Sequence, residues 1–190
     1  SKKQQFGELE NIRGAREADI PVLTALEYCA YRIGNYVIAT KISRIILHLY
    51  DNAESISEAE KADRLSCIAS NLRYLTRYDE ANRYYSISLK IYESMNRSSS
   101  EIKLATARTM NFVGRCMSDV GKYVTAQKNL EGALKVQIEL LGDRHPHVGH
   151  THNNLSILYS RMADYGKAEH HHMRTLEIRM LIHGKHTDHH

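Results

Sequence analysis

The chain has 190 residues, of which 42% are hydrophobic and 25% charged, the composition of a globular domain that can bury a core. Its formal net charge of +4 at pH 7 is too small to indicate nucleic acid binding without a concentrated basic face. No stretch approaches the ~18 consecutive apolar residues of a membrane-spanning helix, and two prolines and ten glycines leave too few turn residues for an all-β fold.

The N-terminal segment is mostly polar and lacks the apolar centre of a signal peptide. Phe6, Leu9 and Ile12 nevertheless have helical spacing, so residues 1–17 are predicted to be part of a preceding repeat or a lead-in helix. The three cysteines are too few and too far apart for a disulfide framework or a zinc ribbon. This favours a reducing compartment, and we predict a cytoplasmic location.

A short turn motif recurs four times along the rest of the chain. It places a tyrosine at positions 36, 78, 123 and 165, with spacings of 42, 45 and 42 residues, and an alanine three residues after each tyrosine. On both sides of each turn, apolar residues recur at intervals of three and four, the period of an amphipathic α-helix. Each turn with its flanks is therefore predicted to be a helical hairpin.

The hairpins divide the chain into repeats. In chain order the predicted repeats are residues 18–58, 59–101, 102–146 and 147–183, and residues 184–190 are predicted to begin the next linker or to be a tag remnant. The polar ends lack an obvious capping helix, which predicts a fragment of a larger protein.

Small residues mark the packing seam between the two helices of a hairpin, because helix axes approach closely only where side chains are small. Ala69, Gly114 and Ser156 stand at this place in three of the first helices, but the first repeat has Glu27 there, which predicts looser packing. Cys29 and Cys116 both lie two residues beyond the seam position, and this recurrence predicts that both are buried.

These residues resemble the tetratricopeptide repeat, whose pattern has a small residue in the first helix, a Gly-x-Tyr turn and alanines in the second helix. The period of about 42 residues is longer than the usual 34, and with residues 140–148 (LLGDRHPHV) and the Asn153-Asn154-Leu155 run it looks like the kinesin light chain subtype. The second repeat lacks the turn glycine, and His172 and Thr175 depart from the pattern of the fourth. The resemblance covers residues 18–188 and implies an all-α fold, a right-handed α-solenoid of about four helical hairpins.

The sequence contains no motif of a catalytic or cofactor site, such as a glycine-rich phosphate loop, a Gly-x-Ser-x-Gly elbow or a His-Glu-x-x-His helix. We therefore predict no enzymatic activity, no catalytic residue and no cofactor. Eleven of the twelve histidines lie between positions 145 and 190, and neutral imidazoles are ligands for zinc and copper. Neighbouring residues of a helix point about 100° apart, so the run at 170–172 does not chelate as a unit and we predict no metal site, although metal binding by the His-rich part stays open.

Basic and aromatic residues interleave in the second repeat, a pattern that can stack single-stranded bases. They are Arg73, Arg77 and Arg83 with Tyr74, Tyr78, Tyr84 and Tyr85. The register of the repeat instead places Tyr78 in the turn and Tyr85 in the core, so no nucleic acid partner is predicted. No feature favours a membrane partner.

The first helices of stacked hairpins line a concave face. Asparagine carboxamides can satisfy both the C=O and the N–H groups of an extended peptide, and in peptide-binding tetratricopeptide domains groove asparagines have this role. By resemblance it falls here to Asn111, Asn153 and Asn154, while arginines of adjacent repeats can bind carboxylates. The predicted partner-binding residues are Arg73, Arg108, Asn111, Phe112, Arg115, Asn153, Asn154, Ile157 and Arg161, with Phe112 and Ile157 as an apolar anchor site.

The sequence leaves the partner, the parent protein and the oligomeric state open. The predicted function is non-catalytic protein–protein interaction, in which the groove binds an extended and partly acidic peptide or partner as part of a larger scaffold, adaptor or signalling protein. The alternative is self-assembly, in which uncapped solenoid ends stack to form a homo-oligomer.

Overall fold

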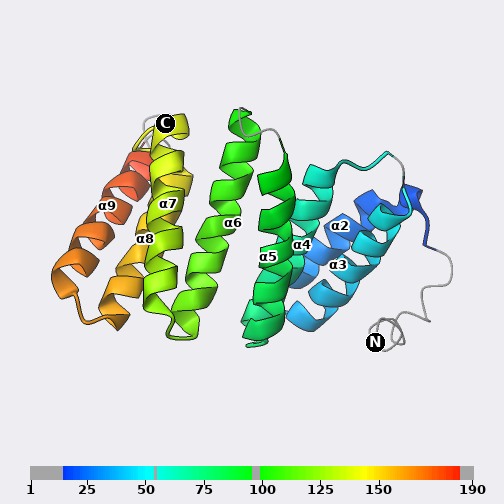
Figure 1. Ribbon diagram of the computed structural model, residues 1–190, viewed down its shortest axis with the longest axis horizontal. Helices are drawn as coiled ribbons and strands as arrows, with labels where there is room; N and C mark the ends of the chain where they lie inside the picture. The colour runs from blue at the N-terminus through cyan, green and yellow to red at the C-terminus, as the bar shows by residue number, and fades with distance from the viewer. Residues whose placement is uncertain (1–14, 54, 96–98, 185–190) are drawn as a thin grey trace. The chain divides into compact units, whose positions relative to one another are not determined.

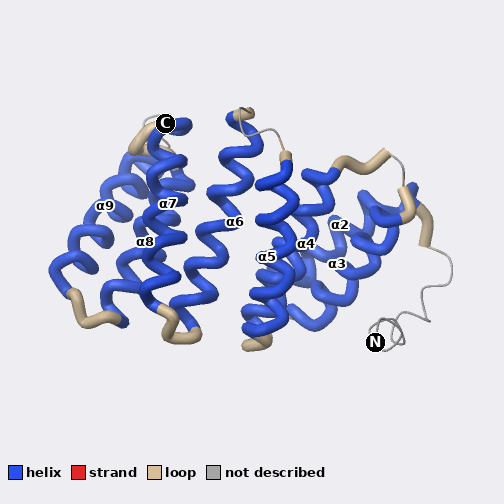
Figure 2. The backbone as a smooth tube through the Cα atoms, in the orientation of Figure 1, coloured by secondary structure: helices blue, strands red, loops and turns tan. Residues whose placement is uncertain are grey.

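The computed structural model describes residues 15–53, 55–95 and 99–184, and the predicted elements at 1–14 and 185–190 lie outside them. The described residues form α-helices joined by short connections, with no strand among them (Figures 1 and 2). A short 3-10 helix, η2 (Glu17–Asp19), precedes α2 (Ile20–Arg32), α3 (Tyr36–Asp51), α4 (Glu58–Tyr74), α5 (Tyr78–Ser94), α6 (Ser100–Asp119), α7 (Tyr123–Leu141), α8 (Pro146–Arg161) and α9 (Tyr165–Gly184). The all-α fold and its four helical hairpins are as predicted.

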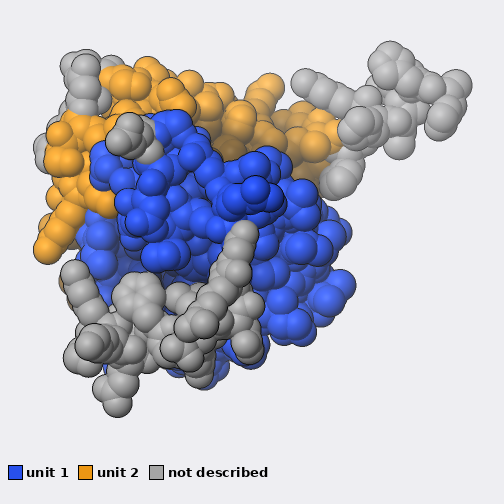
Figure 3. All heavy atoms as spheres, turned by 90° about the vertical axis from the view of Figure 1, so that its right-hand side faces the viewer, with its two compact units in different colours: residues 1–88 blue, residues 89–190 orange. Residues whose placement is uncertain are grey.

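The chain divides into two compact units, residues 1–88 and residues 89–190, which Figure 3 shows in different colours. The division falls within α5. In the first unit α3 packs against both α2 and α4, and in the second unit α7 packs against both α6 and α8, while α9 packs on α8.

The helices begin at residues that satisfy their free backbone N–H groups. Before α4, Ser57 and Glu60 form a reciprocal capping box, in which Glu60 N–H donates to Ser57 Oγ at 3.3 Å and Ser57 N–H donates to Glu60 Oε2 at 2.9 Å. The Glu60 carboxylate also accepts a hydrogen bond from Ser57 Oγ at 2.7 Å, and this bond together with the one from the Ser57 N–H holds the pKa of Glu60 below its usual value. At α8, Pro146 occupies the first helical position and the His147 N–H donates to His145 Nδ1 at 3.2 Å.

The four hairpin turns share one backbone conformation. The residue two before each turn tyrosine has a positive φ, 77° at Gly34 and Gly121 and 59° at Thr76 and Ala163. Glycine adopts this region freely, whereas a residue with a Cβ accepts a strain of about 1–2 kcal/mol there. The second and fourth repeats therefore make the same turn without glycine.

The core of the first unit includes Ala39, Ile46, Ile68, Leu72 and Tyr85, all fully buried. The alanine that follows each turn tyrosine is buried in all four hairpins, which confirms the predicted second-helix seam.

Glu27 is buried in the first unit and connects three helices. Its carboxylate accepts a hydrogen bond from Ser43 Oγ on α3 and forms an ion pair with Arg64 on α4. Asn71 Nδ2 in turn donates to Ser43 Oγ at 3.4 Å. The charge that replaces a small residue at this seam is thus matched by a guanidinium and a hydroxyl, as a buried carboxylate requires.

In the second unit, glycine allows the two helices of a hairpin to pack closely at the seam. A Cβ at Gly114 would lie 2.6 Å from Leu130 Cγ, so only a glycine lets α6 approach α7 at this point. Gly149, about two turns before the seam residue Ser156, lets α8 approach α9 in a similar way, because a Cβ there would lie 3.1 Å from Ile178 Cγ2.

The prediction for the two recurrent cysteines was half right. Cys116 is buried, but Cys29 is exposed. A helix position is buried only when another element covers it, and in the described part of the chain α2 contacts chiefly α3 and η2, neither of which covers Cys29.

Candidate functional site

The predicted partner-binding residues fall on α4, α6 and α8. Arg108, Asn111, Phe112 and Arg115 lie on α6, and Asn153, Asn154, Ile157 and Arg161 lie on α8, so these eight belong to the second unit. Arg73 lies on α4 in the first unit and is described with it below.

Two of the three predicted asparagines join α6 to α8. Asn154 Nδ2 donates a hydrogen bond to Asn111 Oδ1 at 2.9 Å, and Arg115 Nη1 donates to Asn154 Oδ1 at 2.9 Å. Asn111 is only 7% exposed. The carboxamides of Asn111 and Asn154 are therefore used between the helices rather than turned out as a free pair.

Asp119 gathers two of the predicted arginines at the end of α6. Arg161 Nη1 lies 2.8 Å from Asp119 Oδ1 and donates to Ser118 Oγ at 3.0 Å, while Arg115 Nε lies 3.7 Å from the same carboxylate oxygen. The Asp119 side chain is 9% exposed. Asp119 was not among the predicted partner-binding residues, although it stands four residues after Arg115, the spacing of an intrahelical ion pair.

The remaining residues of this face are more accessible. Asn153 is half-buried, and its side chain has no hydrogen-bond partner within residues 15–53, 55–95 and 99–184. Phe112 is 41% exposed, and Ile157 is half-buried one helical turn after Asn153. We name these residues with Arg115 and Arg161 the α6–α8 face: Phe112, Arg115, Asn153, Ile157 and Arg161.

In the first unit Arg73 belongs to an aromatic surface. Its guanidinium lies 4.5 Å from the centre of the Tyr74 ring. Tyr74 stacks on Tyr36 with ring centres 4.4 Å apart and meets Tyr31 edge-on at 5.8 Å. Burial and the hydrogen bond to Tyr74 raise the pKa of Tyr31.

Two of the clustered histidines meet between α8 and α9. His152 Nδ1 and His171 Nδ1 are 2.7 Å apart, so one donates and the other accepts. His171 also stacks on Tyr159, whose hydroxyl donates to Glu131 Oε1 at 2.7 Å. Among the described residues, no group of three or more His, Cys, Asp or Glu side chains is placed to hold a metal ion.

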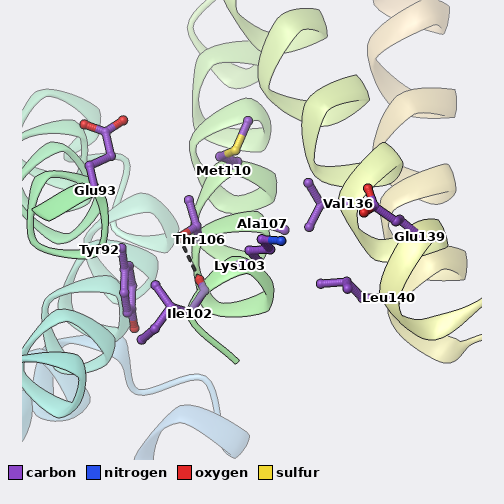
Figure 4. Close-up of a pocket in the computed structure, with 10 residues that line it drawn as sticks. All are labelled: Tyr92, Glu93, Ile102, Lys103, Thr106, Ala107, Met110, Val136, Glu139 and Leu140. Atoms are coloured by element: carbon purple, nitrogen blue, oxygen red, sulfur yellow. Dashed lines mark hydrogen bonds between the residues drawn. The ribbon is translucent and has the colours of Figure 1, made fainter. Parts of the chain in front are cut away.

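A hollow of about 350 Å³ lies beside the last turn of α5, the first half of α6 and the end of α7 (Figure 4). Its lining is mainly apolar: Tyr92, Ile102, Ala107, Met110, Val136 and Leu140, with Glu93, Lys103, Thr106 and Glu139. Figure 4 shows the hydrogen bond of 2.7 Å from Thr106 Oγ1 to the Ile102 carbonyl, which serves the helix itself. These lining residues include no histidine, serine or cysteine.

A second hollow of about 350 Å³ opens where the end of α7 meets the start of α8. It is lined by Glu101, Leu104, Arg108, Gln137, Leu141, His145 and His147. The predicted groove residue Arg108 thus lies at a different place from the α6–α8 face. No helix in the described ranges has the length and hydropathy to cross a membrane.

Comparison with known proteins identifies the repeat and the fold. Residues 103–180 match the family model of the tetratricopeptide repeat. No sequence among the curated proteins matches the chain.

Several solved structures share the fold. BtubC (BKLC) from P. vanneervenii is 22% identical with a TM-score of 0.72 over 86% of this chain and 63% of that one. The TPR-like repeats of a putative kinesin light chain from P. anserina are 13% identical with a TM-score of 0.63 over 92% of this chain and 82% of that one. RapI in its apo form is 21% identical with a TM-score of 0.65 over 97% of this chain. The chain spans 63% of the BtubC structure and 49% of the RapI structure.

Proposed function

This chain has the α-solenoid fold of the tetratricopeptide repeat, and its residues 103–180 match that family; on this premise we propose that it is a non-catalytic protein-interaction module. Repeats of this kind generally mediate protein–protein contacts. The α6–α8 face binds an extended peptide segment of a protein partner, as part of a scaffold, adaptor or signalling protein. We place this activity in the cytoplasm, without a cofactor and without nucleic acid or membrane partners.

The observation that carries the proposal is the fixed row of polar contacts between α6 and α8. The Asn111–Asn154–Arg115 chain of hydrogen bonds and the Asp119–Arg161 ion pair hold the side chains of Arg115 and Arg161 in place before any partner binds. Preorganised groups lose little conformational entropy on binding, so more of their interaction energy is available for affinity.

The ligand's chemistry follows from the groups that remain available. Asn153 can accept from a peptide N–H and donate to a peptide C=O. Arg115 and Arg161 bring two guanidinium groups to this face, and guanidinium groups bind carboxylates, which favours an acidic residue in the partner. Phe112 and Ile157 offer an apolar anchor site beside it. Asn111, Asn154, Arg108 and Arg73 were also predicted to bind the partner, and this role remains a proposal for each of them, with Arg73 in the first unit.

A peptide-display selection on the wild-type chain and on Asn153→Ala tests this function. We expect enrichment of an extended motif with an acidic residue, and a loss of affinity of about tenfold in Asn153→Ala, because one or two buried hydrogen bonds to the peptide disappear. Asn129→Ala is the matched control, since Asn129 on α7 donates to its own helix at Thr125 O. Equal enrichment by wild type and both variants would show that the partner binds at another surface.

Self-association is the second candidate, because α9 exposes a stripe of apolar side chains. Met173, Leu176 and Met180 are exposed at spacings of three and four, on one face of the helix. Stacking on a second copy would cover them. Gel filtration at two concentrations distinguishes the candidates: a stacked chain elutes earlier at the higher concentration and Met180→Lys abolishes the shift, whereas a monomeric peptide binder elutes identically in both runs.

A further inference from the structure

We propose that α2 carries a docking surface for a second copy of this chain, whose α9 packs on it. This docking rests on the self-association proposed above as the second candidate function, and it adds the surface that receives the second copy. We name this surface the α2 stripe. Its residues are exposed and follow one face of the helix at spacings of four, three and four: Val22, Leu26, Cys29 and Ile33.

The residues in the corresponding places of the other first helices are buried. Leu26 stands ten residues before the turn tyrosine Tyr36 and is 52% exposed. The three residues at the same distance before the other turn tyrosines are at most 7% exposed: Ile68, Val113 and Leu155. The places of Val22 and Cys29 are likewise filled by buried residues in the other three helices: Arg64, Thr109 and Thr151, and Asn71, Cys116 and Leu158. Among the described first helices, α2 alone leaves this face uncovered.

In α4 and α8 this face is covered by the second helix of the preceding hairpin. The Arg64 guanidinium of α4 lies 5.8 Å from the ring centre of Tyr50 on α3, and Asn71 Nδ2 donates to Ser43 Oγ of α3 at 3.4 Å. On α8, Thr151 donates through Oγ1 to Oε1 of a glutamine on α7 at 2.6 Å. The occupant that fits the α2 stripe is therefore a second helix of the same repeat.

The exposed face of α9 is the one by which such a helix covers the next hairpin. We name it the α9 stripe, and its residues are Met173, Leu176 and Met180. Met173 stands eight residues after its turn tyrosine, the place of Glu131 in α7, whose Oε1 accepts from the Tyr159 hydroxyl of α8 at 2.7 Å. Leu176 has the place of Leu134 on α7, one turn further on. The α9 stripe thus offers to a second copy the face that α7 offers to α8.

Charge favours the same orientation of α9 along α2. Arg179 is exposed and has the place of Gln137, which accepts from Thr151 in the first half of α8. Packed in the same way, Arg179 comes to the start of α2, where η2 carries the carboxylates of Glu17 and Asp19. Opposite charges at this end would fix the direction in which α9 lies on its partner.

The proposed interface joins two different surfaces of the chain. Such a heterologous contact does not end at a dimer, because each added copy presents an unused α2 stripe or α9 stripe to the next one. Few apolar side chains are covered on either side, so we expect weak and reversible association. The mean size of the particles should therefore increase steadily with concentration instead of stopping at twice the mass of the chain.

Two variants that each block one stripe test this docking by sedimentation velocity. Leu26→Lys and Met180→Lys each place a charge in an apolar contact, and either alone is expected to weaken self-association by at least about tenfold. Mixed in equal amounts, each variant supplies the stripe that the other lacks, so the mixture should form a dimer and nothing larger. Val124→Lys is the matched control, because Val124 is an exposed apolar residue of α7 outside both stripes, and it should associate as the wild type does.

A disulfide between copies tests the register of the contact. The neighbours Asn71 and Ser43 have the places of Cys29 on α2 and His172 on α9. We therefore expect His172→Cys to form an intermolecular disulfide with Cys29 under oxidised glutathione, seen as a ladder of multiples on a non-reducing gel. The ladder should disappear when Cys29→Ser is added. Lys135→Cys, at an exposed position of α7, is the control and should give no such ladder.

The outcomes distinguish this docking from the functions proposed above. Self-association that persists in Leu26→Lys, or a mixture of the two blocked variants that stays monomeric, would overturn docking on α2 while self-association through another surface stands. A wild type that is monomeric at every concentration would overturn both, and resistance of Cys29 to alkylation in that monomer would identify another part of the chain as the cover of the α2 stripe. Peptide selection on the α6–α8 face gives its result independently of either outcome.

Discussion

At the scale of single residues, the pair of imidazoles between α8 and α9 makes the stability of the fourth repeat depend on pH. His152 is 5% exposed, and burial together with the neighbouring His171 lowers its pKa to about 4. The pKa of His171 is lowered as well, by burial and by His170. The 2.7 Å contact between the two Nδ1 atoms needs at least one neutral ring, since two imidazolium ions have only donors to offer.

We expect the free energy of unfolding to fall on acidification. The folded-state pKa of His152 lies below the ordinary value of 6.5, so the folded chain binds this proton less well than the unfolded chain does. Its stabilisation is complete above about pH 6.5 and lost as the pH falls toward 4, a change of up to about 3 kcal/mol. Urea unfolding of wild type and His152→Gln between pH 7 and 4.5 measures it. Parallel curves for the two proteins would contradict the assignment to His152.

At the scale of elements, the hairpins share a seam at which a small residue on one helix faces a larger residue on the other. The first helix contributes Gly114 where the second contributes Leu130, and Ala69 where the second contributes Tyr85. The first repeat reverses the order, with the large Glu27 opposite the small Ser43. Total volume at the seam is what close packing constrains, so a large residue on one helix requires a small one on the other.

Two glycine substitutions test this seam. Gly114→Ala is expected to destabilise the chain by about 1–3 kcal/mol, because the new Cβ would lie 2.6 Å from Leu130 Cγ in a close-packed core. Gly166→Ala is the control: a Cβ there meets nothing within 4 Å, so the change should be neutral or slightly stabilising. Thermal unfolding midpoints of the two variants give the comparison, and similar midpoints would mean that the seam relaxes around a methyl group.

At the scale of the whole molecule, the contacts that matter are local in sequence order. Each hairpin of a repeat protein contacts its neighbours, so stability is a sum of repeat and interface contributions. Glu27 and Arg64 act within residues 1–88, whereas the histidine pair and the α6–α8 face lie within residues 89–190. The histidine-rich segment from residue 145 onward therefore belongs to the second unit alone.

Glu27→Ala should consequently affect one unit. Removing the carboxylate leaves the Arg64 charge buried without its partner, a loss of about 3 kcal/mol, and amide hydrogen exchange should accelerate in α2, α3 and α4 while α8 and α9 keep their protection. Glu58→Ala is the control, because its 3.3 Å contact with Lys61 is exposed and contributes less than about 1 kcal/mol. Faster exchange throughout the chain would show that the two units unfold together.

In the candidate site, positions along a single helix could be predicted from the sequence, but contacts between helices could not. Helical register predicted that Phe112 and Arg115 share a face of α6, because register depends only on spacing along a single helix. It could not distinguish Asn153, which remains available, from Asn154, which bonds Asn111 on another helix 43 residues away. The ion pair of Asp119 with Arg161 was not predicted for the same reason, since it joins α6 of one hairpin to α8 of the next.

The sequence by itself determined the helices, the turns and the repeat, because apolar spacing, turn tyrosines and small seam residues are local properties of the chain. It also indicated buried positions such as Ala126 and Leu130, where the repeat pattern places the seam of the second helix. The tertiary structure alone decided that Glu27 is matched by Ser43 and Arg64, that Cys29 is exposed, and that Asn154 bonds Asn111 on another helix. These depend on which side chains of separate helices come within hydrogen-bond distance, and packing sets that distance.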